Sequence, residues 1–336
     1  MDEKGFREFV KKGERVPKNM PEETVRSNIR MVREFERFLR TERAKKGYDD
    51  AKERDVRAFI KHLAKDDRST FDNLIGLLRY ARFRDNRDAE LALLVILDGS
   101  SILGILCDTV KSEHGEGVFE ELLGDFTPPP IGTSFKRLPK ATSEFMGRVE
   151  SGLGERKTRA LLLTGPHAGP PEAYAEERRM FEASKDVDDY LRRRREKFVG
   201  ELRDHMEKGT LFFTQPIDRD ALDLVEGNPE IAGGVRKGNW IYCTKVPYMI
   251  IDHLKEKDPK LRRYHYCHCP LARESILSGE TMSRNLCYCS AGYEKRPFDV
   301  AFGKSVKAEV KQSVLWGDPV CRFAIEIPEE HRVKKA

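Results

Sequence analysis

Apolar residues recur at helical spacing through the first third of the chain. Between residues 21 and 46 they fall at Val25, Ile29, Val32, Phe35 and Leu39, with charged residues between them. This spacing is typical of an amphipathic helix with one buried side. The same pattern predicts further helices near residues 56–63, 71–81, 91–97, 102–110 and 118–123. We therefore predict an all-helical N-terminal domain over residues 1–126.

Three consecutive prolines, Pro128 to Pro130, follow this helical region. Proline cannot continue a helix, and a run of prolines favours an extended, stiff segment. We predict a proline-rich linker over residues 127–139 and a second domain over residues 140–336.

The second domain begins with helical spacing and ends with strand-like runs. Residues 140–208 read as helices, interrupted by the glycine- and proline-rich stretch at 164–171. Short β-prone runs follow at 211–214, 240–244 and 264–267, and the last two runs, 306–314 and 320–327, are joined by a turn that predicts an antiparallel hairpin. The predicted fold class is α+β: an all-helical domain, then a helix-rich α+β domain that ends in an antiparallel β-hairpin.

Composition indicates a soluble globular protein. The chain has 336 residues, of which 39% are hydrophobic and 35% charged. Its longest apolar stretch, residues 91–106, contains Asp98 and Gly99 and predicts a pair of buried helices, not a membrane span. The first residues lack the apolar core of a signal peptide, so we expect a cytoplasmic protein. A net charge of +5 is far from the strongly basic surface of a dedicated nucleic-acid binder.

Four cysteines form two C-x-C pairs late in the chain, Cys267 with Cys269 and Cys287 with Cys289. In a reduced compartment such a concentration of thiols is typical of a metal site. If each pair is extended, its two side chains point the same way. Two pairs would then supply the four thiolates of a tetrahedral site.

The identity and role of the metal stay open at this stage. Zinc is the default for four thiolates, and a closed site would be structural, whereas a site with one open position would be Lewis-acidic. An iron–sulfur cluster also takes four thiolates, and a redox dithiol pair is a further alternative. His265 and His268 are spare nitrogen ligands, and Cys321 on the last predicted strand is either an additional ligand or a small core residue.

Other candidates for chemistry lie outside the cysteine pairs. The loop at 165–172 presents His167 and Glu172, which could act as an acid/base pair or belong to a plain helix connection. Lys245 is a further candidate catalytic residue, and both it and the run 264–266 are candidates to line a pocket. The glycine-bearing stretch 233–239 could bind an anion through backbone amides or form a tight turn. The arginine run 192–195 covers more than a helical turn, which favours a solvated helix face.

The segment from about Thr24 to Asn86 resembles the helical core-binding domain of tyrosine recombinases. The positions that carry the likeness are Thr24–Val25–Arg26, Phe35–Phe38–Leu39, Val56–Phe59–Leu63 and Asn73–Leu78–Tyr80–Phe83. The catalytic half of that family has no recognisable counterpart, because Thr164–Gly165–Pro166–His167 lacks the arginine of the family's Thr-Gly-Leu-Arg stretch. The resemblance implies that nucleic acid is a candidate partner, without recombination.

Residues 240–327 resemble an uncharacterised prokaryotic family rich in cysteine. The likeness rests on the stretches 267–274 (CHCPLARE), 287–293 (CYCSAGY) and 317–323 (GDPVCRF). The last of these is also similar to vinyl-reductase-type small-ligand domains and to aminothiazoline-carboxylate hydrolases. That resemblance implies an α+β fold with a small-molecule pocket above the sheet, in some members with metal-bound cysteines.

Three functional hypotheses follow. In the first, the chain is a cytoplasmic metalloprotein that binds a small organic ligand in a pocket near His167, Lys245, His265 or Tyr293. An enzymatic form of this hypothesis has the protein also transform the ligand. In the second, zinc holds together an interaction protein that has no catalytic activity. In the third, a DNA-associated regulator senses a ligand or redox state through its metal domain.

Overall fold

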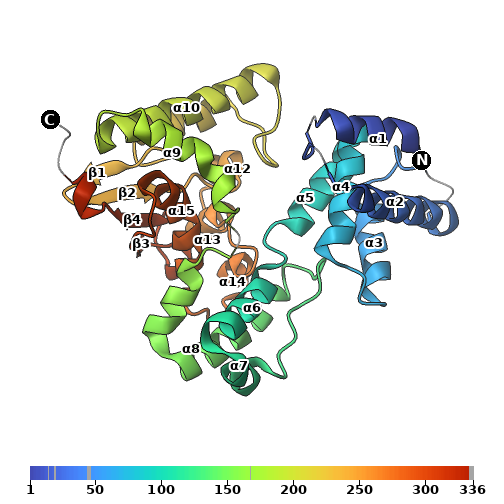
Figure 1. Ribbon diagram of the computed structural model, residues 1–336, viewed down its shortest axis with the longest axis horizontal. Coiled ribbons are helices and arrows are strands. Elements are labelled where there is room, and N and C mark those ends of the chain that lie inside the picture. Colours follow the sequence, from blue (N-terminus) through green and yellow to red (C-terminus); the bar gives the residue numbers. More distant parts are fainter. Residues whose placement is uncertain (14, 19, 44–46, 167, 333–336) are drawn as a thin grey trace. The chain divides into compact units, whose positions relative to one another are not determined.

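The computed structural model describes residues 1–336 except 14, 19, 44–46, 167 and 333–336. By internal contacts the chain divides into two compact units. Unit 1 comprises Met1–Ser101 with Pro128–Ser134, and unit 2 comprises Ile102–Thr127 with Phe135–Ala336. The α+β prediction is confirmed: helices dominate, and one small antiparallel sheet lies in the C-terminal part (Figure 1).

Unit 1 is helical. Its helices are α1 (Glu3–Lys12), α2 (Glu22–Glu42), α3 (Glu53–Ala64), α4 (Phe71–Arg84) and α5 (Arg87–Leu97). Side-chain caps start several of them; the Thr70 side chain, for example, accepts a hydrogen bond from the Asn73 backbone amide. The apolar stripe predicted for α2 is buried, and Phe35 of α2 meets Phe59 of α3 with ring centroids 4.9 Å apart.

The proline-rich segment packs on unit 1. Residues 128–134 contain neither helix nor strand, Ile131 lies against the apolar core, and the Ser69 hydroxyl donates to the Ile131 carbonyl at 2.6 Å. Gly132 has a φ of +92°, and a Cβ atom there would lie 2.3 Å from Ile60 Cγ2. The proline run itself has no helix, as the proline pattern predicts, and it ends in a turn in which the Thr133 amide donates to the Pro130 carbonyl at 3.0 Å.

Unit 2 begins with α6 (Ile102–His114), α7 (Glu116–Leu123) and α8 (Leu138–Leu163). Leu106 and Val110 of α6 share one apolar cluster with Phe145 and Val149 of α8. The sequence pattern places residues 102–126 in the N-terminal domain, and the contacts instead group them with unit 2. Periodicity identifies the apolar face of α6 but not the partner that covers it.

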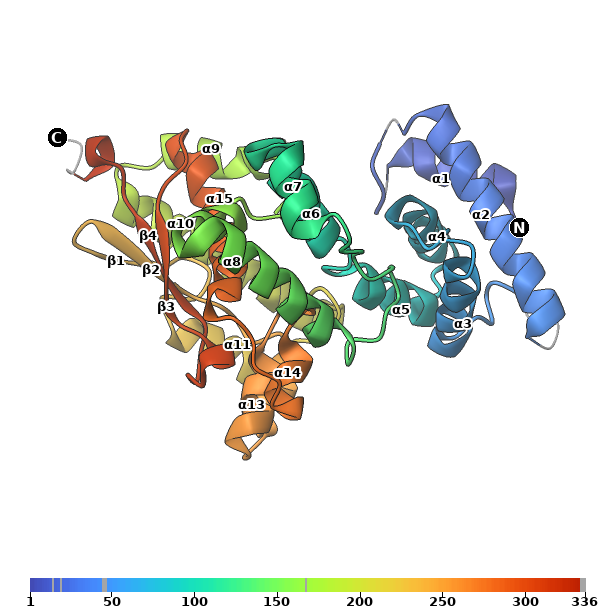
Figure 2. The same ribbon diagram turned by 90° about the horizontal axis from the view of Figure 1, so that it is seen from below.

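The rest of unit 2 surrounds a four-stranded sheet. Its helices are η1 (Pro171–Tyr174), α9 (Ala175–Glu182), α10 (Val187–Lys208), α11 (Arg219–Gly227), α12 (Ile250–Lys255), α13 (Pro259–Tyr266), α14 (Arg273–Ser278), η2 (Arg284–Leu286), α15 (Cys287–Phe302), η3 (Val314–Trp316) and η4 (Glu329–His331). Helix α15 contacts the sheet, α8 and α9, and α10 contacts the first strand (Figure 2). The sheet cluster, an apolar core that includes Phe298, Phe302, Phe323 and Ile325, fills the space between sheet and helices.

All strand pairs in the sheet are antiparallel. The strands β1 (Val235–Lys237), β2 (Trp240–Thr244), β3 (Ala308–Gln312) and β4 (Arg322–Glu326) lie in the order β1-β2-β4-β3. The predicted C-terminal hairpin is thus confirmed as β3 and β4, and the predicted strand at 240–244 as β2.

Three local predictions are wrong. Residues 264–266 are not a strand but the last residues of helix α13. This helix begins upstream, where the Asp258 side chain caps it and Pro259 occupies its first turn. Residues 211–214 form no strand; Phe212 and Gln215 make only an isolated bridge. Helix α15 begins at Cys287 itself, so the second C-x-C pair is helical where an extended segment was expected.

One helical stretch, residues 87–114, is long and apolar enough to cross a membrane by length and composition. Half of its apolar window is buried within the structure, and a turn at residues 98–101 separates α5 from α6. Burial of this kind is typical of core helices in a soluble protein.

Candidate functional site

Five of the seven cysteines come together in unit 2 from three separate segments. Cys267 and Cys269 follow helix α13, Cys287 and Cys289 lie in the first turn of α15, and Cys321 directly precedes strand β4. Cys269 and Cys321 pack against a small apolar cluster around Cys267, which we call the α13 cluster (Tyr266, Cys267, Ile276 and Val314). We call the five side chains the thiol cluster.

The thiols lie close enough together to affect one another's pKa. Burial raises the pKa of Cys267 well above its ordinary value, and the charges of Cys269, Cys321 and Cys287 raise it further. Burial likewise raises the pKa of Cys287, with contributions from Cys321, Cys269 and Cys289. Ionising one thiol therefore opposes ionising the next, and burial favours the neutral forms of Cys267 and Cys287.

Polar neighbours already contact several sulfur atoms. The Ser313 hydroxyl lies 3.0 Å from Cys287 Sγ. Backbone amides of Cys269 and Val314 donate to the sulfur atoms of Cys267 and Cys321, which favours their thiolate forms. Such donors are the usual second layer around metal-bound thiolates.

Cysteine thiolates are suitable ligands for a soft metal ion, but the sulfur atoms in this structure are not arranged as a coordination shell. Within the described residues, no three Cys, His, Asp or Glu side chains are arranged closely enough to hold a metal. One reason is that Cys287 and Cys289 belong to a helix, where residues two apart diverge by about 200°. The extended geometry expected for the second pair is therefore wrong, and the ligand set stays a prediction.

Lys245, one of the predicted catalytic residues, lies beside the thiol cluster. It follows strand β2, its side chain is 8% exposed, and Nζ is 3.5 Å from Glu294 Oε1 and 5.1 Å from the centre of the Tyr293 ring. Its backbone amide donates to the Cys321 carbonyl at 3.0 Å. The Lys245 charge also lowers the pKa of Cys289 and of Cys321, although burial outweighs it for both thiols.

The other predicted residues are placed as follows. Glu172 is exposed in η1, and its proposed partner His167 lies outside the described residues. His268 Nε2 is 2.6 Å from the Val246 carbonyl oxygen. His265 Nδ1 is buried, and the described residues offer it no hydrogen-bond partner.

Sequence reasoning missed three polar residues near the thiols: Ser313, Glu294 and Arg273. Arg273 is 9% exposed and lies one turn after Cys269, whose carbonyl accepts its backbone amide. Its guanidinium is surrounded by the rings of Phe135, Tyr248 and Tyr264, with ring-centre distances of 5.7, 4.7 and 5.2 Å. The signal for Arg273 and Glu294 was their position shortly after a cysteine pair.

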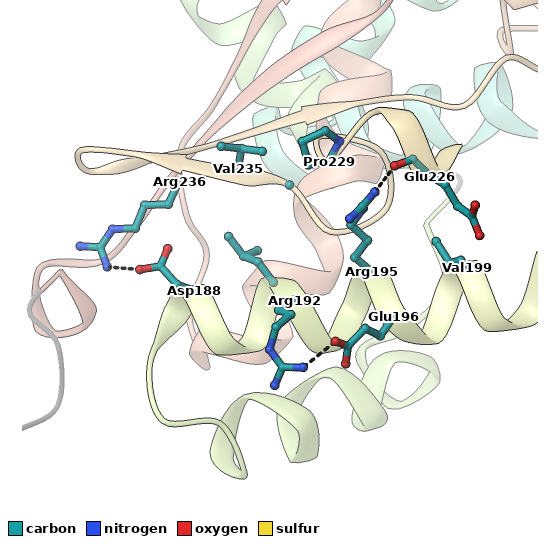
Figure 3. A pocket seen from close by; sticks show the side chains of 11 residues that line it. Asp188, Arg192, Arg195, Glu196, Val199, Glu226, Pro229, Val235 and Arg236 are labelled. Atoms are coloured by element: carbon teal, nitrogen blue, oxygen red, sulfur yellow. Dashed lines mark hydrogen bonds and ion pairs between the residues drawn. The ribbon is translucent and has the colours of Figure 1, made fainter. Parts of the chain in front are cut away.

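A separate surface pocket of about 550 Å³ lies between α10 and strand β1 (Figure 3). Its lining includes Arg192, Arg195, Glu226 and Arg236, and none of the thiols. The arginines are already engaged: Arg192 pairs with Glu196, Arg195 donates to the Glu226 carbonyl, and Arg236 lies 3.8 Å from Asp188 (Figure 3). The glycine-bearing stretch at 233–239 contains strand β1 and, at 238–239, the tight β1–β2 turn, as one of its two interpretations predicted.

The arginine run 192–195 is solvated only in part. Arg192 and Arg193 bind Asp189 on the outer face of α10. Arg194 points inward, with its guanidinium carbon 4.7 Å from the Phe298 ring centre and its Nε 2.9 Å from Glu177.

Comparison with known proteins finds one similarity. No curated protein and no solved structure matches the chain. The matched segment, residues 254–332, runs from the end of α12 through the sheet hairpin and contains all five members of the thiol cluster. Over these residues the chain is similar to DUF6144, a family of unknown function.

Proposed function

We propose that unit 2 binds one zinc ion through the thiol cluster, in a soluble cytoplasmic protein whose C-terminal domain holds a small organic ligand. The observation that carries the proposal is the convergence of five cysteines from three distant segments. Chance packing of small apolar residues would not select cysteine five times, since alanine and valine fill such positions equally well.

Zinc suits the electrostatics of the cluster. The neutral thiols oppose one another's ionisation, and a divalent cation removes that opposition by binding the thiolates directly. Zinc accepts four thiolates without redox chemistry. An iron–sulfur cluster also requires four thiolates and is the alternative to zinc. The visible absorption spectrum distinguishes the two, because a zinc protein is colourless and an iron–sulfur protein is brown.

Burial favours a closed, structural site over a catalytic one. Cys267 is 5% exposed, and Cys269, Cys287 and Cys321 are partly buried, so a substrate would have to displace packed side chains to reach a metal held there. A closed zinc site would fasten α13, α15 and the sheet together, as the interaction-protein hypothesis also requires. The chemistry that the metal supplies when bound is then stabilisation of the fold.

The ligand part of the proposal rests on Lys245 and on the resemblance to vinyl-reductase-type domains. A buried ammonium group beside an aromatic ring and a carboxylate offers one cation and one acceptor to a small polar molecule. Ligand binding is expected to be lost in Lys245→Met and retained in Lys237→Met, a substitution of an exposed lysine at the end of β1.

The direct test is the metal content of purified protein. We expect about one zinc ion per chain in the wild-type protein and none in the double variant Cys267→Ser/Cys269→Ser. Cys243→Ser is the matched control, because Cys243 is equally buried but its pKa responds to no other cysteine. Equal metal content in all three proteins would refute the proposal.

A further inference from the structure

The two cysteines of the second pair face different parts of the protein. Cys287 packs against the sheet cluster, whereas Cys289 belongs to the apolar cluster around α8, together with Leu271 and Leu286. The helix imposes this divergence, because positions two apart on a helix do not share a face. A single metal ion cannot take both sulfur atoms unless the first turn of α15 unwinds.

Cys321 is a better candidate than Cys289 to share a metal ion with the other cysteines. It packs against the α13 cluster, which contains Cys267, and against the sheet cluster, which Cys287 also contacts. The Ser313 hydroxyl lies 3.0 Å from Cys287 Sγ, and Ser313 belongs, like Cys321, to the connection between β3 and β4. Cys287 therefore lies against the segment of chain that carries Cys321.

The hairpin fixes Cys321 in that place. Its carbonyl accepts the Lys245 backbone amide at 3.0 Å, and its sulfur accepts the Val314 amide. The turn between the strands is closed by Ser313, whose backbone amide donates to Asp318 Oδ2 at 2.9 Å. Cys321 is thus held by backbone contacts from two other segments, as is usual for a metal ligand on a rigid element.

We propose that Cys321 replaces Cys289 as the fourth metal ligand, an inference that rests on the proposed zinc site. The ligand set is then Cys267, Cys269, Cys287 and Cys321. Closing it requires the four sulfur atoms to approach one another, and leaves α15 intact. The metal would link three segments: the end of α13, the start of α15 and the start of β4. Cys289 remains a buried thiol next to Lys245.

Single serine variants test the assignment. Zinc is measured by elemental analysis in the wild-type protein, Cys321→Ser, Cys289→Ser and the control Cys243→Ser, and each protein is also loaded with cobalt to count thiolates from its charge-transfer absorption. We expect Cys289→Ser and Cys243→Ser to retain the wild-type zinc content and cobalt spectrum. Cys321→Ser should bind zinc at least about a hundredfold more weakly, with weaker thiolate absorption.

A footprint on the wild-type protein makes the result independent of variant folding. Alkylation by N-ethylmaleimide is followed by mass spectrometry in zinc-loaded and zinc-stripped protein. Zinc should protect Cys321 and leave the modification of Cys289 unchanged. Protection of Cys289 but not Cys321, or zinc loss in Cys289→Ser, overturns the assignment while the zinc proposal stands. Wild-type protein without metal overturns the zinc proposal, and this inference with it.

Discussion

Lys245 bears on both the proposed metal site and the stability of unit 2. Its ammonium group is buried, faces the Glu294 carboxylate and lies close enough to influence two thiols of the cluster. A zinc ion held by four thiolates would carry a net negative charge, and a buried cation nearby would offset it. We therefore expect the Lys245 side chain to act on both the ion pair and the proposed metal.

Lys245→Met separates these two roles when it is combined with Glu294→Gln. The single variant removes the cation from a mostly buried carboxylate, which should lower the free energy of unfolding by about 1–3 kcal/mol. Zinc affinity should fall by roughly 10–100-fold. The double variant should recover most of the stability but not the affinity, as measured by denaturant unfolding and competition with a chelator. Unchanged affinity in both variants would show that Lys245 does not serve the metal site.

His253 makes the stability of unit 2 depend on pH. It is buried, its Nδ1 lies 3.0 Å from the Arg262 carbonyl oxygen, and burial lowers its pKa below the ordinary value. Because the folded state disfavours the charged ring, this contribution is fully present above the unfolded pKa of about 6.5 and is lost as pH falls through the lower folded pKa. We expect the free energy of unfolding to fall below about pH 6.5, and to fall less in His253→Asn. Identical pH profiles of unfolding for the two proteins would contradict this role.

At the scale of elements, α15 determines where the candidate site lies, because it carries two of the thiols and contacts α8, α9 and the sheet. At Gly292 it lies close to the C-terminal end of α8. A Cβ atom there would lie 2.8 Å from the Gly165 amide nitrogen and 2.9 Å from the Leu162 and Leu163 carbonyl oxygens. These neighbours are backbone atoms, so they cannot rotate away as a side chain would.

Gly292→Ala should therefore destabilise unit 2 by about 1–3 kcal/mol, through the overpacking that forces α15 away from α8. Gly200→Ala is the matched control: Gly200 lies inside α10, and a Cβ atom there meets nothing within 4 Å. This control should be neutral or stabilising by up to about 1 kcal/mol, since alanine favours helix. Thermal unfolding of the two variants gives the comparison, and equal midpoints would argue against a tight α8–α15 contact.

Local patterns predict elements well where each residue's environment follows from its neighbours in sequence. The stripe Val25 to Leu39 and the terminal hairpin are of this kind. The strand predicted at 264–266 is wrong. The aromatic residues there favour a strand, but Asp258 and Pro259 start a helix upstream that includes them.

The candidate site was predictable only in part, for the same reason. The C-x-C spacing identifies the thiols, and the structure places Lys245 beside them. The divergence of Cys287 and Cys289 depends on where α15 begins, and the approach of Cys321 depends on how the hairpin packs. Both depend on tertiary packing, which the periodicity of apolar residues along the chain does not predict.

At the scale of the whole molecule, the two units have separate cores, and all five thiols belong to unit 2. Ligands that bind only the folded state stabilise it in proportion to their affinity. Metal removal by a chelator should therefore lower the stability of unit 2 by several kcal/mol and leave unit 1 unchanged. Hydrogen exchange read by mass spectrometry should show faster exchange over residues 254–332 and no change over 1–101. Equal loosening of both units would mean that the metal acts elsewhere.

The most direct test of the account is the metal content of the wild-type protein together with its visible absorption spectrum, after purification both without oxygen and in air. The account predicts about one zinc ion per chain and a colourless protein in both preparations. A brown, oxygen-sensitive protein would replace zinc by an iron–sulfur cluster. The absence of metal from both preparations would contradict the central claim and leave the thiol cluster as a set of buried dithiols.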